Sequence, residues 1–572
     1  MVMKTILLCA FGARYSHSSL ALLYLRQAAP GLPIRTAEYN INENPSEVIE
    51  SIISFAPDAV GFSCYIWNIG IVLKVASAVK KLLPECAILL GGPEVSFDAP
   101  VLMRSHDFID IIIHGPGEAP FRCFAQSFCR GESITSTPSA CIRTDGGFVE
   151  TADIKPLSLA DIPFVYDDLS PYANKLIYYE TSRGCPFHCA YCLSAETSLD
   201  FLPVGRVVRE LEFFMRNRVR QVKLVDRTFN YPDSRAREIF SALIDLSAKY
   251  PQSRTNFHFE ISASLLTNET LAVLAFAPPG LIQFEVGIQS THGETLRAVG
   301  RSHSTPALMD RAARLCAMAN LHVHVDLIAG LPLETSDTFA ASFNDAYRLS
   351  ADRLQLGFLK LLKGSPLRAK TDRFGIVYTD DAPYEVLKTA SMSYAELRRL
   401  HRIESLLDTL YNDRAARRTL CLLTVQCPPY DVFNRFAAYL EGQGFFTRPQ
   451  ALASLYEHLY AFAPGLPDID VATLRESLAF DWFSRQSTDC PASFSLPQTN
   501  EQKAFTHHFF ADANVVSRYL PNTGQTVRQL QRRCRIAFFS RLFGSPAAVL
   551  FDYGQKPDLP GFWQIISSEV DL

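Results

Sequence analysis

The sequence contains one short segment whose residue types and spacing suit metal chemistry. Cys185, Cys189 and Cys192 stand within the eight residues CPFHCAYC. Three thiolates on one tight loop can bind three irons of a cubane iron–sulfur cluster, and without a fourth protein ligand one iron stays open for a substrate or cofactor. The alternative is a structural zinc site completed by His188. His188 lies between two of the cysteines, where binding the same ion is geometrically awkward.

The other eleven of the 14 cysteines are scattered along the chain, mostly in apolar or loop contexts. This distribution does not fit a secreted disulfide scaffold, which is short and dense in cysteine. We expect these side chains to be small buried hydrophobes.

Composition and charge exclude several classes of function. Of the 572 residues, 48% are hydrophobic and 20% charged, which suits a chain with several packed cores. The 55 basic and 59 acidic residues give a net charge of −4 without a long basic run, so we expect no nucleic acid partner. No stretch of about 18 apolar residues occurs, so we expect no membrane partner. The first residues fit a buried strand better than a signal peptide, and we expect a cytoplasmic protein.

The elements that position the cysteine loop are predicted from the alternation of apolar runs and amphipathic stretches. Residues 1–135 read as a Rossmann-like βα domain, with strands near 4–11, 34–40, 58–64, 86–92 and 108–115. Strands that alternate with helices predict a parallel sheet covered on both faces. In such sheets ligands bind beyond the carboxyl ends of the strands.

The rest of the chain divides into further segments. Residues 136–172 are predicted to form a linker with a hairpin over 141–151, whose turn is Asp145-Gly146. Residues 173–379 carry a second βα series, which predicts a partial (β/α) barrel. Its strands are expected near 176–182, 221–226, 256–262, 282–288, 322–328 and 353–360. Residues 380–572 are predicted to be a mostly α-helical C-terminal domain, which makes the whole chain an α/β protein.

The cysteine loop resembles that of the radical S-adenosylmethionine enzymes, because C-x3-C-x2-C follows the first barrel strand and an aromatic residue, Tyr191, precedes the last cysteine. The resemblance implies a [4Fe–4S] cluster whose open iron binds the amino and carboxylate groups of S-adenosylmethionine. One electron from the cluster would then cleave the sulfonium to a 5′-deoxyadenosyl radical.

Further polar residues match positions of the subfamily that includes the oxygen-independent coproporphyrinogen oxidase, where they contact S-adenosylmethionine. Together with Tyr191 these are Glu260, Gln289, Arg301 and Asp326. Carboxylates can accept hydrogen bonds from ribose hydroxyls, and a guanidinium can pair with the methionine carboxylate. The alternative for each residue is a salt bridge at the barrel end. Asp226 also matches a family position, with a structural role as its alternative.

The first domain resembles the cobalamin-binding domain of cobalamin-dependent radical S-adenosylmethionine enzymes, through the segments GFSCYIWNIG, ILLGGPEVS and DIIIHGPGEAPF. The resemblance implies that its βα loops contact the corrin through Tyr15, Ser16, His17, Ser63, Tyr65, Trp67, Asn68, Gly91, Gly92, Glu94, Gly115 and Glu118. One departure is that no D-x-H-x-x-G motif occurs, and neither His17 nor His114 has its spacing. We therefore expect cobalamin without a histidine lower ligand. The alternative is a scaffold domain without a corrinoid.

The two resemblances together imply methyl transfer to an unactivated carbon or phosphorus centre, through methylcobalamin and cluster-bound S-adenosylmethionine. A low-potential electron donor, flavodoxin or ferredoxin, and a small-molecule or peptide substrate are the expected partners. Alternatives are a radical rearrangement, cyclisation or ring contraction without methyl transfer, a methylthiotransferase-like enzyme, and a non-enzymatic corrinoid carrier. The cysteine triplet argues against the carrier. No residue names the substrate or the oligomeric state.

Overall fold

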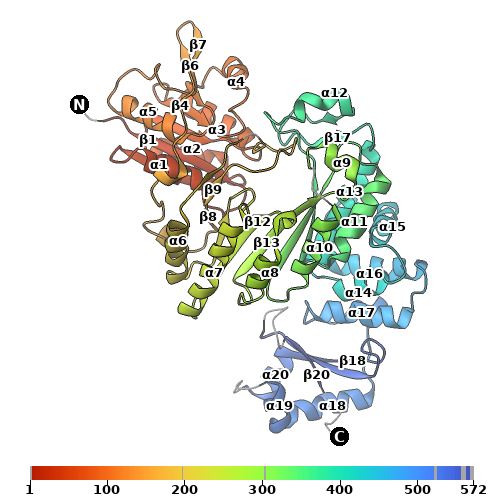
Figure 1. Ribbon diagram of the computed structural model, residues 1–572. Helices are drawn as coiled ribbons and strands as arrows, with labels where there is room; N and C mark the ends of the chain where they lie inside the picture. The colour runs from red at the N-terminus through yellow and green to blue at the C-terminus, as the bar shows by residue number, and fades with distance from the viewer. Residues whose placement is uncertain (1–2, 196, 302–304, 521–524, 556–561, 567–572) are drawn as a thin grey trace. The chain divides into compact units, whose positions relative to one another are not determined.

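The structure, a computed structural model, describes residues 3–195, 197–301, 305–520, 525–555 and 562–566 (Figure 1). The chain folds into two compact units. The first comprises Met1–Phe339, Leu349–Asp352 and Leu356–Tyr394, and the second comprises Ala340–Arg348, Arg353–Gln355 and Ala395–Leu572. The candidate site residues all belong to the first unit.

The first part of the chain forms a sheet, here called the front sheet, with strand order β2-β1-β3-β4-β5-β6-β7. Its strands are β1 (Ile6–Gly12), β2 (Ile34–Asn40), β3 (Ala59–Ser63), β4 (Ala87–Gly91), β5 (Ile111–Ile113), β6 (Ala140–Thr144) and β7 (Gly147–Glu150). The connecting helices are α1 (Leu20–Ala28), α2 (Pro45–Ser54), α3 (Ile69–Leu82), α4 (Ala99–Ser105) and α5 (Glu118–Cys129). The strands from β1 to β5 pair in parallel, as the sequence predicts.

The side chains of β1 explain why helices cover the front sheet on both faces. Leu7, Cys9 and Phe11 belong to a core that includes residues of α2, α3 and α4. Leu8 and Ala10 belong to a second core with residues of α1 and α5. Successive residues of a strand point to opposite sides of the sheet, so a continuous apolar strand requires helices on both sides.

The hairpin predicted over 141–151 is present and extends the front sheet at its edge. Strand β6 pairs antiparallel with β5 and with β7. Thr144 lies opposite Gly147, so Asp145 and Gly146 form the turn between them. The positive φ of this hairpin, +135°, belongs to Gly147 directly after the turn, where glycine adopts it without a steric penalty.

A second sheet, here called the barrel sheet, has the strand order β15-β14-β13-β12-β11-β8. Its strands are β8 (Ile177–Tyr179), β11 (Gln221–Leu224), β12 (Asn256–Ile261), β13 (Ile282–Gln289), β14 (His322–Ala329) and β15 (Arg353–Phe358). Its helices are α6 (Val204–Arg216), α7 (Asp233–Lys249), α8 (Asn268–Leu274), α9 (Gly293–Ala298), α10 (Thr305–Cys316) and α11 (Ser336–Arg348). The pairs from β8 to β14 are parallel, which confirms the predicted βα series.

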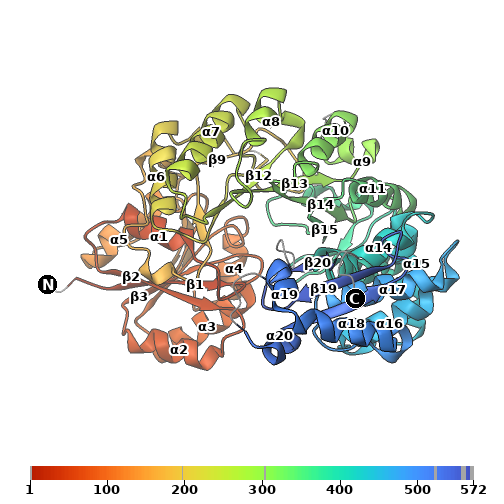
Figure 2. The same cartoon turned by 90° about the horizontal axis from the view of Figure 1, so that it is seen from below.

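Burial alternates along the barrel strands and separates an apolar face from a polar one. In β13 the buried residues are Ile282, Phe284, Val286 and Ile288. Phe284 contacts Phe240 of α7 at 5.6 Å between ring centroids. Figure 2 shows α7, α8 and α10 on the outer side of the curved sheet. The polar residues of the same strands therefore point to the inner, concave side, where the site is expected.

Short elements complete the first unit. They are β9 (Ser182–Arg183), β10 (Asp200–Phe201), α12 (Thr371–Phe374), β16 (Val377–Tyr378) and β17 (Val386–Lys388). Strand β9 pairs antiparallel with β10, and β16 with β17. Strand β9 lies directly before the cysteine loop.

The C-terminal region is mostly helical, as predicted. Its helices are α13 (Tyr394–Leu407), α14 (Arg417–Leu423), α15 (Pro429–Gly442), α16 (Leu452–Phe462), α17 (Val471–Phe483), α18 (Asn500–Ala511), α19 (Ala513–Tyr519) and α20 (Val527–Arg533). A small antiparallel sheet that the sequence analysis did not predict follows, formed by β18 (Cys534–Phe539), β19 (Ala547–Asp552) and β20 (Trp563–Ile566). In the described part of the chain, no helix has the length and apolar character needed to cross a membrane.

Candidate functional site

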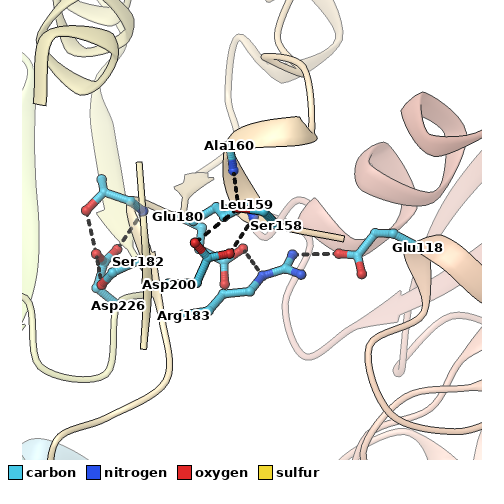
Figure 3. A network of polar contacts seen from close by, with 10 residues as sticks. Glu118, Ser158, Leu159, Ala160, Glu180, Ser182, Arg183, Asp200 and Asp226 are labelled. Atoms are coloured by element: carbon cyan, nitrogen blue, oxygen red, sulfur yellow. Dashed lines mark hydrogen bonds and ion pairs between the residues drawn. The ribbon is translucent and has the colours of Figure 1, made fainter. Parts of the chain in front are cut away.

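The cysteine loop leaves the barrel sheet from a segment that one buried carboxylate fixes. Asp226, which follows β11, is fully buried. It accepts hydrogen bonds from the backbone N–H of Thr181 at 2.9 Å, from the Thr181 hydroxyl at 2.5 Å and from the Ser182 hydroxyl at 2.6 Å (Figure 3). Burial raises the pKa of Asp226, and these hydrogen bonds oppose the rise. The observed contacts of Asp226 therefore fit the structural role considered for it.

The backbone at Gly184, directly before the first cysteine, tolerates no side chain. Its φ is +84°, and a Cβ there would lie 2.4 Å from the carbonyl oxygen of Ser198. Further along, Ala190 donates its N–H to the Val299 carbonyl at 2.9 Å and accepts one from Leu367 at 2.7 Å. The loop is thus held at its start and again between its second and third cysteines.

Each of the cysteine sulfurs has a polar neighbour. Cys185 Sγ lies 3.3 Å from the Thr228 hydroxyl, and the N–H of Ser194 donates to Cys192 Sγ at 3.4 Å. The Arg301 guanidinium donates to Cys189 Sγ at 3.9 Å. Burial raises the pKa of the Cys189 thiol, whereas Arg301 lowers it. Hydrogen-bond donors around thiolates are typical of iron–sulfur ligands, so these surroundings fit a cluster.

The zinc alternative depends on His188. Its Nδ1 contacts the backbone carbonyl of Ala195, within the same loop. Among the residues that the structure describes, no three His, Cys, Asp or Glu side chains are grouped so as to hold a metal ion. The thiolates of a cubane bind different irons and need not converge on one point, so this finding does not bear on the cluster.

Arg301 and Tyr191, both predicted to contact S-adenosylmethionine, lie beside the cysteines. Arg301 donates to the Tyr191 hydroxyl at 3.2 Å and to the Gly287 carbonyl at 2.7 Å. The Arg301 Nε is buried and has no hydrogen-bond partner among the described residues. A buried donor without a partner is costly unless a ligand supplies an acceptor, which fits the predicted role.

The other predicted contacts lie on the polar face of the barrel strands. Gly287 is paired with Asp326 in the sheet, and a bulge follows at Gln289, whose φ is +70°. The Gln289 Oε1 is buried and unpartnered within the described ranges. Glu260 lies 3.5 Å from Lys223, and burial raises the pKa of its carboxyl. The structure thus places Glu260, Gln289 and Asp326 on one face, and their contacts with S-adenosylmethionine stay predictions.

A cavity of about 700 Å³, here called the main cavity, lies where the front sheet meets the cysteine loop. From the front sheet it is lined by residues at the carboxyl ends of β1, β2 and β3, and from the barrel side by residues at the ends of β8, β9 and β11. Ligands of open parallel sheets bind outside the carboxyl ends of the strands. Here the carboxyl ends of strands from both sheets border the same space.

Most of the predicted corrin contacts border this space or a smaller cavity of about 120 Å³ beside it. The main cavity is lined by His17, Ser63, Tyr65, Trp67 and Glu118, and the smaller one by Ser63, Tyr65, Gly91, Gly92, Gly115 and Glu118. At Gly92 the φ of +112° and a Cβ position 2.6 Å from the Cys64 carbonyl exclude any other residue.

The remaining predicted corrin contacts have protein partners or face outward. Asn68 is buried and donates to the carbonyls of Phe11 and Ser63. Glu94 pairs with Lys363 at 3.1 Å and accepts the Tyr384 hydroxyl. Tyr15 and Ser16 are exposed. None of these residues lines the main cavity, and their contacts with a corrin stay predictions.

The residues that do line the main cavity fit a large flat ligand. The Tyr65 and Trp67 rings stack with centroids 4.4 Å apart and planes 7° apart, which gives the wall an aromatic face. The Ser63 hydroxyl is buried and finds no partner in the part of the chain described. His17 Nδ1 contacts the Tyr178 hydroxyl at 2.7 Å, and His114 Nδ1 lies 3.5 Å from Asp153. The expectation that no histidine is the lower ligand stays a prediction.

Charged residues of the main cavity went unnoticed in the sequence. Arg183 contacts Glu118 at 2.5 Å and Glu180 at 3.0 Å (Figure 3), and Arg227 lines the same cavity. Burial raises the pKa of Glu180 to about 7, although the Arg183 guanidinium opposes this rise. Arg183 lies two positions before the first cysteine, which is the signal that could have drawn attention to it.

Comparisons with protein families agree with this layout. The family described as "B12 binding domain" matches residues 9–125, and "Radical SAM superfamily" matches residues 179–346. A family described as "Protein of unknown function (DUF4080)" matches residues 372–545. The last match covers most of the helical C-terminal region.

Individual curated proteins are similar to more than half of this chain. The cobalamin-dependent radical SAM methyltransferase TokK of Streptomyces tokunonensis is 27% identical, over 58% of this chain and 51% of its own. The 2-(S-pantetheinyl)-carbapenam-3-carboxylate methyltransferase of Streptantibioticus cattleyicolor is 27% identical, over 55% and 49%. The chain therefore spans about half the length of these curated relatives.

Solved structures share the fold. The radical S-adenosylmethionine methyltransferase TsrM from Kitasatospora setae, with cobalamin and a [4Fe–4S] cluster bound, has a TM-score of 0.56 at 18% identity, covering 69% of this chain and 81% of its own. The cobalamin-dependent S-adenosylmethionine radical enzyme OxsB, with aqua-cobalamin bound, has a TM-score of 0.60 at 13% identity, covering 89% and 84%.

The cluster assignment predicts the behaviour of a cysteine variant. Replacing Cys185, Cys189 and Cys192 together by Ala removes every thiolate of the loop, so we expect loss of the brown absorption and of nearly all bound iron after anaerobic reconstitution. Iron and sulfide analysis beside the parent protein measures this. A variant that retains a full cluster would contradict the assignment.

The raised pKa of Glu180 predicts a pH dependence of stability. In the unfolded chain the carboxyl has its ordinary value near 4.5, and in the folded chain its pKa is about 7. The folded state therefore binds the proton more tightly, and this stabilisation, complete below pH 4.5, is lost as the pH rises to 7. We expect the free energy of unfolding of the parent, relative to Glu180→Gln, to fall between pH 5 and 8. Anaerobic denaturant titrations measure it, and a constant difference across this range would refute the shift.

The family matches and the residues of the two sites agree on the cofactors. These are cobalamin for the B12-binding domain, and a [4Fe–4S] cluster with S-adenosylmethionine for the radical SAM domain. The chain thus combines a B12-binding domain with a radical SAM domain in one polypeptide, and its homologues include cobalamin-dependent radical S-adenosylmethionine enzymes.

Proposed function

We propose that this enzyme transfers a methyl group from S-adenosylmethionine to an unactivated carbon or phosphorus centre of a small-molecule or peptide substrate, by way of its cobalamin. The observation that carries the proposal is the main cavity, which strand ends of both sheets border. None of the three cysteines lines this cavity, but Gly184 and Ser194, which stand on either side of them, do. A methyl group can pass between two cofactors only if their sites adjoin in this way. The similarity to named methyltransferases supports this choice over the other radical reactions.

The bound groups supply the chemistry: cobalamin carries a methyl group, and the cluster provides the electron that activates S-adenosylmethionine. The chain supplies positions and charges. Arg301, Glu260 and Asp326 are proposed to hold the carboxylate and ribose of S-adenosylmethionine, as their place beside the cysteines and on the inner barrel face supports. The stacked Tyr65 and Trp67 rings are proposed to support the corrin.

Glu180 gives the main cavity a group that can exchange a proton near neutral pH. It lines the cavity, and its pKa of about 7 lies close to the pH at which a general acid or base is most effective.

A low-potential flavodoxin or ferredoxin is proposed as the electron donor, because reduction of such clusters requires one.

The methyl-transfer proposal is tested without knowledge of the substrate. The anaerobically reconstituted protein, loaded with hydroxocobalamin and reduced by titanium(III) citrate, is given S-adenosylmethionine with a trideuterated methyl group. We expect trideuterated methyl on cobalamin and an equal amount of S-adenosylhomocysteine by mass spectrometry. Free cobalamin under the same conditions is the control.

Formation of 5′-deoxyadenosine without any labelled methyl on cobalamin would contradict methyl transfer. That result would favour a rearrangement, cyclisation or ring contraction.

A further inference from the structure

The guanidinium of Arg183 joins the front domain, defined here as the front sheet with α1 to α5, to the start of the cysteine loop. It lies 2.5 Å from Glu118, the first residue of α5, and 3.0 Å from Glu180, just beyond β8 (Figure 3). Its centre stands 5.5 Å from the centroid of the Tyr24 ring in α1. One side chain therefore contacts helices of the cobalamin domain and a residue at the carboxyl end of a barrel strand.

All of these side chains line the main cavity. Their ion pairs are thus exposed on one side to whatever fills that space, while the protein shields them on the other. The interaction of two charges grows as the local dielectric constant falls. A corrin that displaces water from the main cavity strengthens the pairs of Arg183, and an empty, wet cavity weakens them.

The backbone of Arg183 is held directly before the cysteine loop. In the antiparallel pair of β9 and β10 the backbone of Arg183 lies opposite that of Asp200. The Asp200 carboxylate accepts the N–H of Leu159 at 2.6 Å. Gly184, which permits no Cβ, follows, and then comes Cys185. A change in the side-chain contacts of Arg183 therefore acts on a segment only two residues from a cluster ligand.

We propose that Arg183 is a positioning residue that couples occupancy of the cobalamin site to the geometry of the cysteine loop, so that cobalamin and S-adenosylmethionine bind cooperatively. The inference rests on the proposed function in that cobalamin would occupy the main cavity, which Gly184 and Ser194 border on either side of the cysteines. Coupling between two sites is reciprocal, so each ligand must raise the affinity for the other by the same factor. A coupling free energy in the usual range corresponds to a factor of about 5 or more.

The test measures binding, not turnover, on the full chain with its cluster oxidised and no reductant present. Isothermal titration gives the dissociation constant of S-adenosylmethionine with and without saturating hydroxocobalamin. We expect cobalamin to tighten binding by about fivefold or more in the parent protein. The converse titration of cobalamin, with and without S-adenosylmethionine, is expected to give the same factor.

Variants separate coupling from general damage. In Arg183→Gln we expect the tightening of S-adenosylmethionine binding by cobalamin to fall to a factor close to one. In Arg183→Lys, which keeps the charge, we expect a factor between one and that of the parent. The matched control is Arg206→Gln, because Arg206 is 20% exposed against 21% for Arg183 and pairs with Glu210 inside α6. Arg206 does not line the main cavity, so we expect its variant to keep the parent's factor.

If Arg183→Gln assembles no cluster, Glu118→Gln replaces it, because this change breaks the ion pair from the front domain and leaves the cysteine loop's sequence intact. The proposal is overturned if cobalamin does not change the dissociation constant of S-adenosylmethionine in the parent protein. It is also overturned if cobalamin tightens this binding as much in Glu118→Gln, or in a cluster-containing Arg183→Gln, as in the parent. Failure of methyl transfer in the labelling assay leaves the titrations readable, so the two proposals fail separately.

Discussion

The buried carboxylate of Asp226 is the contact on which the arrangement of the site depends. It binds the backbone and hydroxyl of Thr181 and the hydroxyl of Ser182, next to the residues that lead into the cysteine loop. Hydrogen bonds to a charged group contribute about 1.5–3 kcal/mol each, and a buried carboxylate without them is strongly unfavourable. The segment that leads into the loop is therefore held in place, and this restricts the positions of both Arg183 and Cys185.

Ion pairs also join the front domain to the radical SAM part of the chain. Glu38 of β2, Glu94 after β4 and Glu118 of α5 pair with Lys175, Lys363 and Arg183 of the radical SAM part. The carboxylates all come from the first 118 residues and the cations from later residues of the same unit, so the pairs favour one mutual orientation. Of these pairs, the one with Arg183 stands next to the cluster ligands.

Much of the fold follows from local sequence patterns. The alternating residues of β13 and β14 predict strands with one polar face. Glu260 of β12 lies opposite Glu285 of β13, and Asp326 of β14 lies opposite Gly287, so both belong to this face. The small C-terminal sheet was not predicted, because α20 is basic and runs into Cys534 without a break, so RQLQRRCR reads as one helix face.

The site was predictable where a motif is local and unpredictable where partners are distant. The spacing C-x3-C-x2-C is enough to single out Cys185, Cys189 and Cys192. Glu94 meets Tyr384, 290 residues later in the chain, and Glu118 meets Arg183, 65 residues later. No local sequence pattern predicts such pairs, because they form only when distant parts of the chain pack together.

If the corrin fills the main cavity, it lies next to the cysteine loop, because Gly184 and Ser194 border that cavity on either side of the three cysteines. The magnetic interaction between cobalt and cluster measures this proximity. Dipolar coupling between two unpaired spins falls with the cube of their separation. The protein is loaded with cob(II)alamin, and its electron paramagnetic resonance signal is recorded with the cluster oxidised and then reduced. We expect faster spin relaxation and a broadened cobalt signal once the cluster is reduced. A cobalt signal unchanged by cluster reduction, with both cofactors bound at full occupancy, would contradict it.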